Sequence, residues 1–248
     1  MTEVNNPPAG SEKKIVVVEN GPYKVLGKIS LVRKTQIVSE FGEPLTWEKL
    51  GDIQTGSDTY LLCRCGKSKN MPFCDQTHLR SGFDGTEQAK TAGPSRWQIT
   101  FPGGTRLIVT KDVSLCMNSG FCNLRNTGID QLTRASDDTQ LRSLAIAMVE
   151  RCPSGSLTYK VEPASAIIEP DYPQQIADTI EITSDGPIAG PLWVTGCVPI
   201  ERADGKPFTA RNRVTLCSCG QSNNKPLCDG THRSIAEETA KKKKRGNG

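Results

Sequence analysis

The sequence is poor in aromatic and apolar residues, and only two histidines occur among its 248 residues. Aromatic residues make up 5% and hydrophobic residues 35% of the chain, so one large hydrophobic core is not expected. No stretch approaches the roughly 18 apolar residues of a membrane-spanning helix, and the polar N-terminus from Met1 to Lys14 offers no signal peptide. We therefore expect a soluble, cytoplasmic protein built from small modules, in which thiols stay reduced.

Excess positive charge is confined to one end of the chain. The net charge is +4, and the run Lys241–Arg245 accounts for all of that excess, so the remainder is close to neutral. A run of like charges is typical of a solvated chain end, and we expect residues 237–248 to form a basic disordered tail. Binding to nucleic acid or to a membrane is not expected.

The usual sets of catalytic residues are missing as well. No pair of carboxylates, no Ser/His/Asp set and no phosphate-binding glycine loop stands out in the sequence. Both histidines belong to one repeated cysteine motif, which leaves neither for acid–base catalysis. An enzyme active site is therefore not expected.

What the sequence does contain is a cysteine motif that occurs twice with identical spacing. The pattern C-x-C-x2-S-x3-P-x-C-D-x-T-H runs from Cys63 to His78 and again from Cys217 to His232. Side chains two residues apart on a strand point to the same side, and side chains four apart on a helical turn share a face. The expected pairs of donor groups are Cys63 with Cys65, Cys74 with His78, Cys217 with Cys219, and Cys228 with His232.

Three thiols and one imidazole form a metal-binding set, and the spacing alone leaves two kinds of metal centre open. A Cys3His set is a known structural zinc site. Thiolates with a histidine substitution also hold iron–sulfur clusters. A disulfide fits less well, because a spacing of one residue strains a bond within the pair.

Both stretches resemble the CDGSH iron–sulfur motif of the mitoNEET-like family, C-x-C-x2-[ST]-x3-P-x-C-D-G-[SAT]-H. The copy from Cys217 to His232 matches at every position, and the copy from Cys63 to His78 departs once, with Gln76 where glycine is usual. The resemblance implies one [2Fe–2S] cluster for each motif, held by its three cysteines and its histidine. Because relatives with one motif form intertwined homodimers, it also implies a monomer with internal pseudo-two-fold symmetry.

The repeat extends beyond the cysteine motif. Gly21–Gly27 corresponds to Gly190–Gly196, and the connection from there to the first cysteine is about 15 residues longer in the N-terminal copy. Apolar runs at 15–18 and 23–26 flank a turn and predict two strands. We expect two β-rich repeats, 15–85 and 180–236, each too small to bury its faces alone and therefore packed together as an intramolecular pseudo-dimer.

A different module is expected between the repeats, at 94–165. Strand-like runs at 96–101 and 105–110 flank Pro102-Gly103-Gly104 and predict a hairpin. A helix capped by Ser136 or Asp137 follows, and its apolar periodicity places Cys152 on the core face near its end. A last strand is expected at 157–161. The whole chain is thus predicted to be an α+β protein with a small ferredoxin-like module between the repeats.

Three further cysteines lie in this middle module, at Cys116, Cys122 and Cys152. A bacterial-type ferredoxin run is C-x2-C-x2-C with a distant C-P, and on that template Ser119 replaces one ligand. The segment resembles the divergent single-cluster ferredoxin family, in which many members have histidine at the position of Asn118. Three thiolates suit a [3Fe–4S] or an incomplete [4Fe–4S] cluster, and the alternative is an empty module whose cysteines only pack.

The sequence favours electron transfer to or from an unidentified redox partner. A cluster donor to an apo-acceptor protein, a redox or pH sensor, and clusters with a purely structural role are the alternatives. The tenth cysteine, Cys197, lies opposite Lys28 of the first copy, so it has no repeated role and is expected to be a small core residue.

Overall fold

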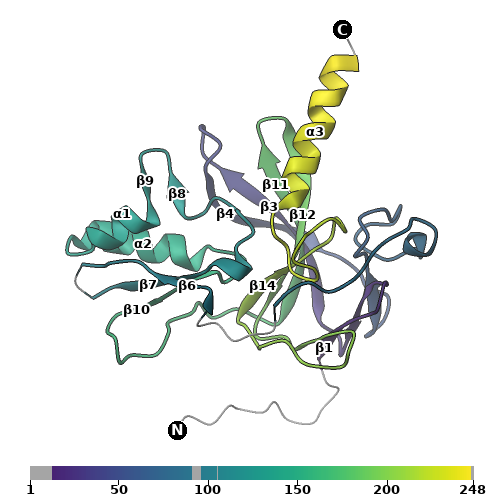
Figure 1. The fold of residues 1–248 in the computed structure, drawn as a ribbon, viewed down its shortest axis with the longest axis horizontal. Helices are drawn as coiled ribbons and strands as arrows, with labels where there is room; N and C mark the ends of the chain where they lie inside the picture. Colours follow the sequence, from purple (N-terminus) through teal and green to yellow (C-terminus); the bar gives the residue numbers. More distant parts are fainter. Residues whose placement is uncertain (1–12, 91–95, 105, 247–248) are drawn as a thin grey trace.

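The computed structural model describes residues 13–90, 96–104 and 106–246, and the structural statements below concern these residues. The fold is of the predicted α+β class, with few helices and several small sheets. Figure 1 shows a middle module beside two β-rich repeats, with one helix projecting from the body. The polar N-terminal stretch, for which no signal peptide is expected, lies outside the described residues as far as residue 12.

The two repeats and the middle module follow one another along the chain. The N-terminal repeat comprises β1 (Lys14–Val17), β2 (Tyr23–Leu26), β3 (Ser30–Val38), β4 (Pro44–Asp52), β5 (Tyr60–Leu62) and the 3-10 helix η1 (Thr77–Leu79). The middle module comprises β6 (Gln98–Thr100), β7 (Ile108–Asp112), the 3-10 helix η3 (Val113–Leu115), β8 (Asn123–Leu124), β9 (Thr127–Gly128), α1 (Ile129–Arg134), α2 (Thr139–Glu150) and β10 (Leu157–Lys160). The C-terminal repeat comprises β11 (Gln175–Thr183), β12 (Gly186–Thr195), β13 (Ile200–Glu201), β14 (Arg213–Leu216) and α3 (Thr231–Gly246).

Each repeat contributes to the sheet of the other: β13 joins the sheet of the N-terminal repeat, and β3 and β4 join that of the C-terminal repeat. The two sheets have the strand orders β13-β1-β2-β5 and β14-β12-β11-β3-β4. Ile15 of β1 pairs in parallel with Ile200 of β13, and Ile176 of β11 pairs in parallel with Leu31 of β3. These pairings are equivalent under the sequence repeat, so the predicted intertwined pseudo-dimer is confirmed. A few strands alone cannot bury both of their faces, and the exchange supplies the missing cover.

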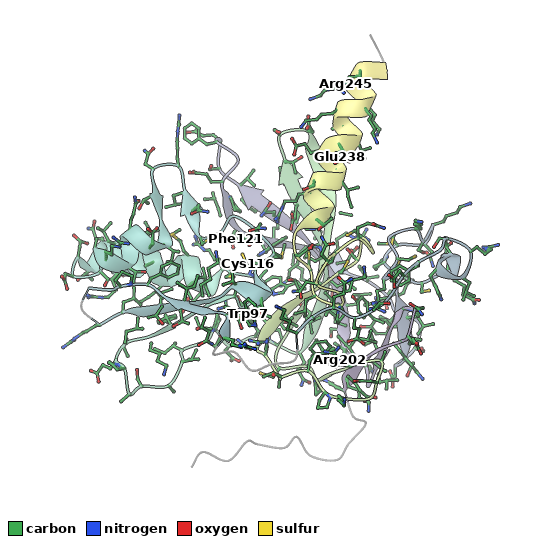
Figure 2. All side chains as sticks on the ribbon, viewed as in Figure 1. Trp97, Cys116, Phe121, Arg202, Glu238 and Arg245 are labelled. Atoms are coloured by element: carbon green, nitrogen blue, oxygen red, sulfur yellow. The ribbon has the colours of Figure 1, made fainter. Side chains whose placement is uncertain are left out.

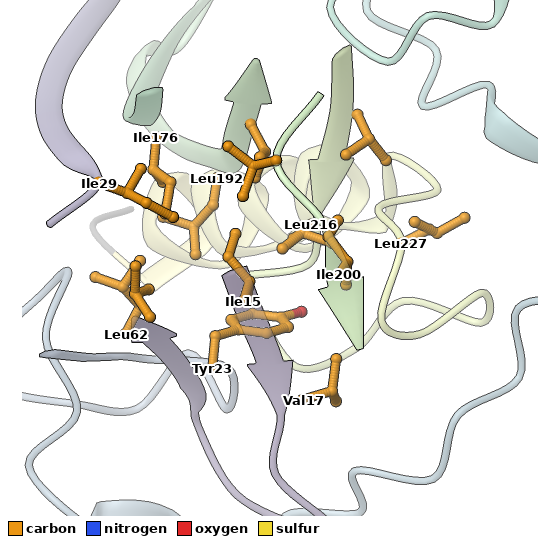
Figure 3. Close-up of a cluster of buried hydrophobic side chains, with 14 of the residues drawn as sticks. Ile15, Val17, Tyr23, Ile29, Leu62, Ile176, Leu192, Ile200, Leu216 and Leu227 are labelled. Carbon is orange, nitrogen blue, oxygen red and sulfur yellow. The ribbon is translucent and has the colours of Figure 1, made fainter. Parts of the chain in front are cut away.

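One hydrophobic core is shared by the two repeats. Figure 3 shows Ile15, Tyr23 and Leu62 of the N-terminal repeat beside Ile176 and Leu192 of the C-terminal repeat, all buried. The middle module has a separate core between α1, α2 and the sheet β10-β7-β6. These two cores, with a third, small cluster of Val32, Ala177 and Trp193, explain how small modules fold without one large interior.

The middle module follows the predicted order of hairpin, helix and strand. The strands β6 and β7 pair antiparallel, although β7 begins at Ile108, later than predicted. The cap of α2 is Asp138, whose carboxylate accepts the N–H groups of Gln140 and Leu141 at 2.7 and 3.1 Å. Ser136 or Asp137 was predicted in that role, but the chain is still turning there, with the N–H of Asp138 bonded back to Ala135 at 3.1 Å. The short helix α1 was not predicted.

The predicted disordered tail is wrong as far as residue 246, because α3 continues through it. Alanine, glutamate and lysine favour helix, and Glu237 pairs with Lys241 one turn on, at 2.6 Å. Lys244 also contacts Asp185, in the turn between β11 and β12, at 2.5 Å. The last part of α3 projects from the body of the protein (Figure 1). No helix among the described residues has both the length and the apolar character needed to cross a membrane.

Candidate metal centres

The N-terminal motif forms two pairs of donor atoms. The sulfur atoms of Cys63 and Cys65 lie 3.7 Å apart. The sulfur of Cys74 lies 3.4 Å from Nδ1 of His78. The sequence prediction that each pair converges is confirmed for this motif.

A short antiparallel bridge between Leu62 and Phe73 brings the two pairs together. The N–H groups of Cys63 and Cys74 donate across this bridge to backbone carbonyls, at 2.7 and 2.9 Å. Cys63 directly follows the end of β5, and His78 lies in η1. The strand end therefore presents the Cys/Cys pair and the helical turn presents the Cys/His pair.

The serine and aspartate of the motif hold the loop in shape. The hydroxyl of Ser68 donates to a backbone carbonyl five residues further on at 2.6 Å, and the carboxylate of Asp75 accepts the N–H of Thr77 at 3.0 Å. Ser222 and Asp229 make the equivalent bonds in the second copy, at 2.7 and 3.0 Å. These two positions are therefore structural parts of the motif, and the donor atoms come from the other four.

The C-terminal motif repeats the geometry in a more buried setting. The sulfur atoms of Cys217 and Cys219 lie 3.7 Å apart, and that of Cys228 lies 3.5 Å from Nδ1 of His232. Cys217, Cys228 and His232 are all buried, whereas Cys74 and His78 are partly exposed in the first copy. The two copies thus offer the same donors with different access to solvent.

These distances are the ones expected between two donor atoms that bind the same tetrahedral metal ion. With metal–sulfur bonds of about 2.3 Å and metal–nitrogen bonds of about 2.0 Å, two sulfurs are separated by about 3.8 Å and a sulfur and a nitrogen by about 3.5 Å. Among the described residues, no three or more of the His, Cys, Asp and Glu side chains gather closely enough to hold a single metal ion. Each motif presents its four side chains as two pairs, Cys/Cys and Cys/His.

The surroundings of several of these thiols shift their pKa values. A hydrogen bond from the Cys219 thiol, helped by backbone N–H groups, lowers the pKa of Cys217 to about 6, and the same contact raises the pKa of Cys219. Burial raises the pKa of Cys228, and it also raises the pKa of Cys74 in the first copy. Thiols whose ionisation is opposed by burial become thiolates when a bound metal supplies the compensating charge.

The three cysteines of the middle module line one cavity of about 130 Å³. Cys116 follows η3, Cys122 precedes β8, and Cys152 follows α2, so three separate elements supply them. Ser119 lines the same cavity. Burial raises the pKa of Cys122, and the neighbouring Cys152 and Cys116 sulfurs add to that shift. Figure 2 shows Cys116 on the side of the middle module that faces the base of α3.

Comparison with known families gives two matches. The family described as "Iron-binding zinc finger CDGSH type" matches residues 20–79 and 189–233, and the one described as "Divergent 4Fe-4S mono-cluster" matches residues 103–162. The chain is an iron–sulfur protein with two CDGSH-type regions. Searches among curated proteins and among solved structures gave no significant match.

The four donors of each motif are called the N-terminal and the C-terminal CDGSH site below, and the three cysteines of the middle module are called the middle site. The members of the N-terminal CDGSH site are Cys63, Cys65, Cys74 and His78. The members of the C-terminal CDGSH site are Cys217, Cys219, Cys228 and His232.

The one departure from the CDGSH pattern, Gln76, is explained by what surrounds the two motifs. Gln76 and Gly230 both have positive φ, 66° and 91°, a conformation that favours glycine. A side chain at Gly230 would place its first carbon 2.5 Å from the carbonyl oxygen of Met117. Gln76 is exposed. Glycine is therefore required by packing only in the C-terminal CDGSH site, where the motif lies against the middle module.

The two CDGSH loops also contact each other, through the glycine that follows each C-x-C pair. A carbon added at Gly66 would lie 2.5 Å from the carbonyl oxygen of Cys219, and one added at Gly220 would lie 2.6 Å from that of Cys65. The contact is reciprocal, as the pseudo-two-fold symmetry requires. It brings the backbones of the two cysteine loops together.

The cysteine loop of the middle site lies against the C-terminal CDGSH site. The guanidinium of Arg233 donates to the carbonyls of Met117 and Asn118, at 2.7 and 2.5 Å, and both residues lie between Cys116 and Cys122. The side-chain amide of Asn224 donates to the carbonyl of Ser114 at 2.7 Å. The three sites thus follow one another in the order middle, C-terminal and N-terminal.

One residue that contacts the C-terminal CDGSH site was not predicted from the sequence. Oε2 of Glu181 lies 3.0 Å from Nε2 of His232 and 2.6 Å from the guanidinium of Arg233. Burial raises the pKa of Glu181, but the hydrogen bond with His232 and the charge of Arg233 outweigh it and hold that pKa below its ordinary value. Glu181 lies 51 residues before His232 in a strand, so no local pattern could have identified it.

The prediction for Cys197 is wrong, because its side chain is exposed. Cys197 has a φ of 55° and its counterpart Lys28 has a φ of 56°, each after a glycine that also has positive φ. The two residues occupy equivalent tight turns after β12 and β2. A turn of this kind at the surface leaves the side chain in solvent.

Proposed function

We propose that each CDGSH site binds one [2Fe–2S] cluster, that the middle site binds a third cluster, and that the protein transfers electrons. One observation carries this proposal. The cysteine loop of the middle site contacts the C-terminal CDGSH site, whose loop in turn contacts that of the N-terminal site. Loops in direct contact keep the three sites close to one another, as an electron relay needs.

The pairing of the donors supports a cluster with two irons at each CDGSH site. One half-site is a pair of cysteines, and the other is one cysteine with one histidine. In a [2Fe–2S] cluster each iron takes two protein ligands, so each half-site fits one iron. We therefore assign Cys63, Cys65, Cys74, His78, Cys217, Cys219, Cys228 and His232 as the eight ligands.

Three thiols at the middle site support a cluster of the [3Fe–4S] or [4Fe–4S] type. Cys116, Cys122 and Cys152 line one cavity, which favours a bound cluster over cysteines that only pack. The family description favours the 4Fe–4S type for this module. Three thiolates hold a [3Fe–4S] cluster directly, whereas a [4Fe–4S] cluster needs a fourth ligand that is not a cysteine.

Bound clusters of these types gain and lose single electrons, and the residues around them set how readily they do so. The neutral imidazoles of His78 and His232 carry no charge, unlike the thiolates that they replace. One histidine should therefore raise the reduction potential above that of an all-cysteine site, in the direction known for two histidines. The proposed partner is a redox protein, and the proposed working form is a monomer with two-fold pseudo-symmetry.

The test is a cycle of reduction and reoxidation of the anaerobically purified protein, followed by visible absorption. An electron carrier should return to its starting spectrum with no loss of iron. Clusters that cannot be reduced, or that are destroyed on reduction, would contradict the proposal and favour a structural role.

A second candidate, donation of a cluster to an apo-acceptor protein, is favoured by the exposure of the N-terminal CDGSH site. Cys74 and His78 are partly exposed, and Gln76 beside them is exposed. Incubation with an apo-ferredoxin separates the two functions. A donor would lose the cluster of its N-terminal CDGSH site to the acceptor, whereas a carrier would keep both clusters.

A further inference from the structure

The two CDGSH sites differ most in what contacts the second nitrogen of the histidine. In the C-terminal CDGSH site, Nε2 of His232 lies 3.0 Å from a carboxylate oxygen of Glu181, and both side chains are buried. In the N-terminal CDGSH site, Nε2 of His78 has no protein partner among the described residues. A carboxylate behind a ligating histidine fixes the orientation of the ring and makes the imidazole a stronger donor to the metal.

A longer hairpin in the C-terminal repeat places Glu181 there. In the β1–β2 hairpin, the pair nearest the turn is Val17 with Tyr23. The equivalent pair in the other repeat is Asp178 with Leu192. The strands β11 and β12 continue beyond that pair, through an irregularity after Asp178, to a turn at 184–185. Glu181 lies in this extension, so the N-terminal repeat has no strand residue at the equivalent place.

Arg233 anchors the carboxylate from the other side. Its guanidinium lies 2.6 Å from the same Oε2 of Glu181 that contacts His232. It also donates to the carbonyls of Met117 and Asn118 in the cysteine loop of the middle site. Two sets of hydrogen bonds and one ion pair therefore connect His232 through Glu181 and Arg233 to that loop.

We propose that Glu181 is a positioning residue that holds His232 and gives the C-terminal CDGSH site a lower reduction potential than the N-terminal site. This inference rests on the proposed function, since it assumes a [2Fe–2S] cluster at each CDGSH site. The hydrogen bond between Glu181 and His232 makes the imidazole a stronger donor to iron, which favours the oxidised cluster, and the burial of the ligands acts in the same direction. The N-terminal CDGSH site has neither the carboxylate nor the same degree of burial.

The test is a redox titration of the full-length, cluster-loaded protein, followed by EPR of the reduced [2Fe–2S] signals. His78→Cys shifts the signal of the N-terminal site and so assigns the two signals. In the wild type, the signal of the C-terminal site should appear at the lower potential. Glu181→Gln should raise that potential and leave the other unchanged, because the amide keeps an oxygen near His232 but removes the charge.

A second variant separates charge from positioning. Glu181→Leu removes the hydrogen bond as well, so it should raise the potential and also speed the loss of the C-terminal cluster at constant pH. Glu181→Gln should change the rate of loss much less. Asp178→Asn is the matched control, because Asp178 lies in the same strand and pairs with Arg33 instead of a histidine. It should leave both potentials close to those of the wild type.

The outcomes distinguish this inference from the proposed function. Two [2Fe–2S] signals whose potentials do not respond to Glu181→Gln, or that both shift equally, would overturn the role of Glu181 and leave the proposed function standing. Absence of any [2Fe–2S] signal from the wild type would overturn the proposed function and this inference with it. The N-terminal signal in each variant reports that the protein has folded.

Discussion

At the scale of single residues, the same motif position tolerates a side chain in one CDGSH site and excludes it in the other. Gln76 adopts a left-handed conformation on an exposed loop, which costs of order 1 kcal/mol relative to glycine. We expect Gln76→Gly to stabilise the protein by up to about 1 kcal/mol, because the strain is relieved and no packing is lost. Thermal or denaturant unfolding of the cluster-loaded protein measures the change.

The reverse substitution in the other repeat is the matched control. Gly230→Gln should destabilise the protein by roughly 2–3 kcal/mol, because a side chain there meets the backbone oxygen of Met117 at 2.5 Å. Equal effects of the two substitutions, in either direction, would show that the contact with the middle module does not set the requirement for glycine.

The histidine of each CDGSH site should set both its potential and its response to acid. His232→Cys should lower the reduction potential of the C-terminal cluster, because a thiolate adds a negative charge that neutral imidazole lacks. The wild-type cluster should be lost faster as the pH falls, since a protonated imidazole cannot bind iron, and the variant should be lost more slowly. Potentials from redox titration and decay rates from visible absorption provide the measurements. An unchanged potential and decay rate would rule out His232 as a ligand.

The eight donors could be predicted at this scale, whereas their surroundings could not. Strand and helical-turn spacing places Cys63 beside Cys65 and Cys74 beside His78 with no knowledge of the rest of the chain. Glu181 reaches His232 only because β11 is extended, and the sequence does not reveal that the extension points at the motif. Contacts made by tertiary packing leave no periodic pattern in the local sequence from which they could be predicted.

At the scale of elements, α3 joins a proposed cluster ligand to a projecting basic arm. His232 lies in its first turn, and the lysine run lies in its last turns. We expect Ala240→Pro to unwind the arm, because proline removes a helix hydrogen bond and clashes with the preceding turn. The far-UV circular dichroism should lose helical signal while both CDGSH centres are retained. Loss of the C-terminal centre would show that the arm is part of that site.

The short strands and the helix α2 were predictable from turns and periodicity, but the tail was not. A run of like charges predicts repulsion and disorder when it stands alone. Here the run continues a helix that is already started at Thr231, and Asp185 on the neighbouring hairpin neutralises Lys244. Continuity with a packed element and one tertiary ion pair override the local pattern.

At the scale of the whole molecule, the two largest hydrophobic cores belong to different parts of the chain. The shared core of the repeats and the core of the middle module are separate, and Cys152 belongs to the latter. Cys152→Ala should therefore remove the cluster of the middle site and leave both [2Fe–2S] signals intact. EPR of the reduced and oxidised variant checks this. Loss of a CDGSH signal would show that the middle module is required to form that centre.

The pseudo-two-fold arrangement followed from the sequence, and the position of the middle module did not. A repeat too small to bury its own faces has to pack against its copy, and the parallel pairs of Ile15 with Ile200 and of Ile176 with Leu31 confirm that it does. The contact of Met117 with Gly230 arises from surface fit between modules, for which the sequence carries no comparable pattern.

Iron and sulfide content of the anaerobically purified protein, with EPR of the same sample, tests the central claim most directly. We predict about seven irons in each chain if the middle cluster is [3Fe–4S], or about eight if it is [4Fe–4S], together with [2Fe–2S] signals on reduction. About four irons and [2Fe–2S] signals alone would contradict the third centre. Zinc in place of iron would contradict the account as a whole.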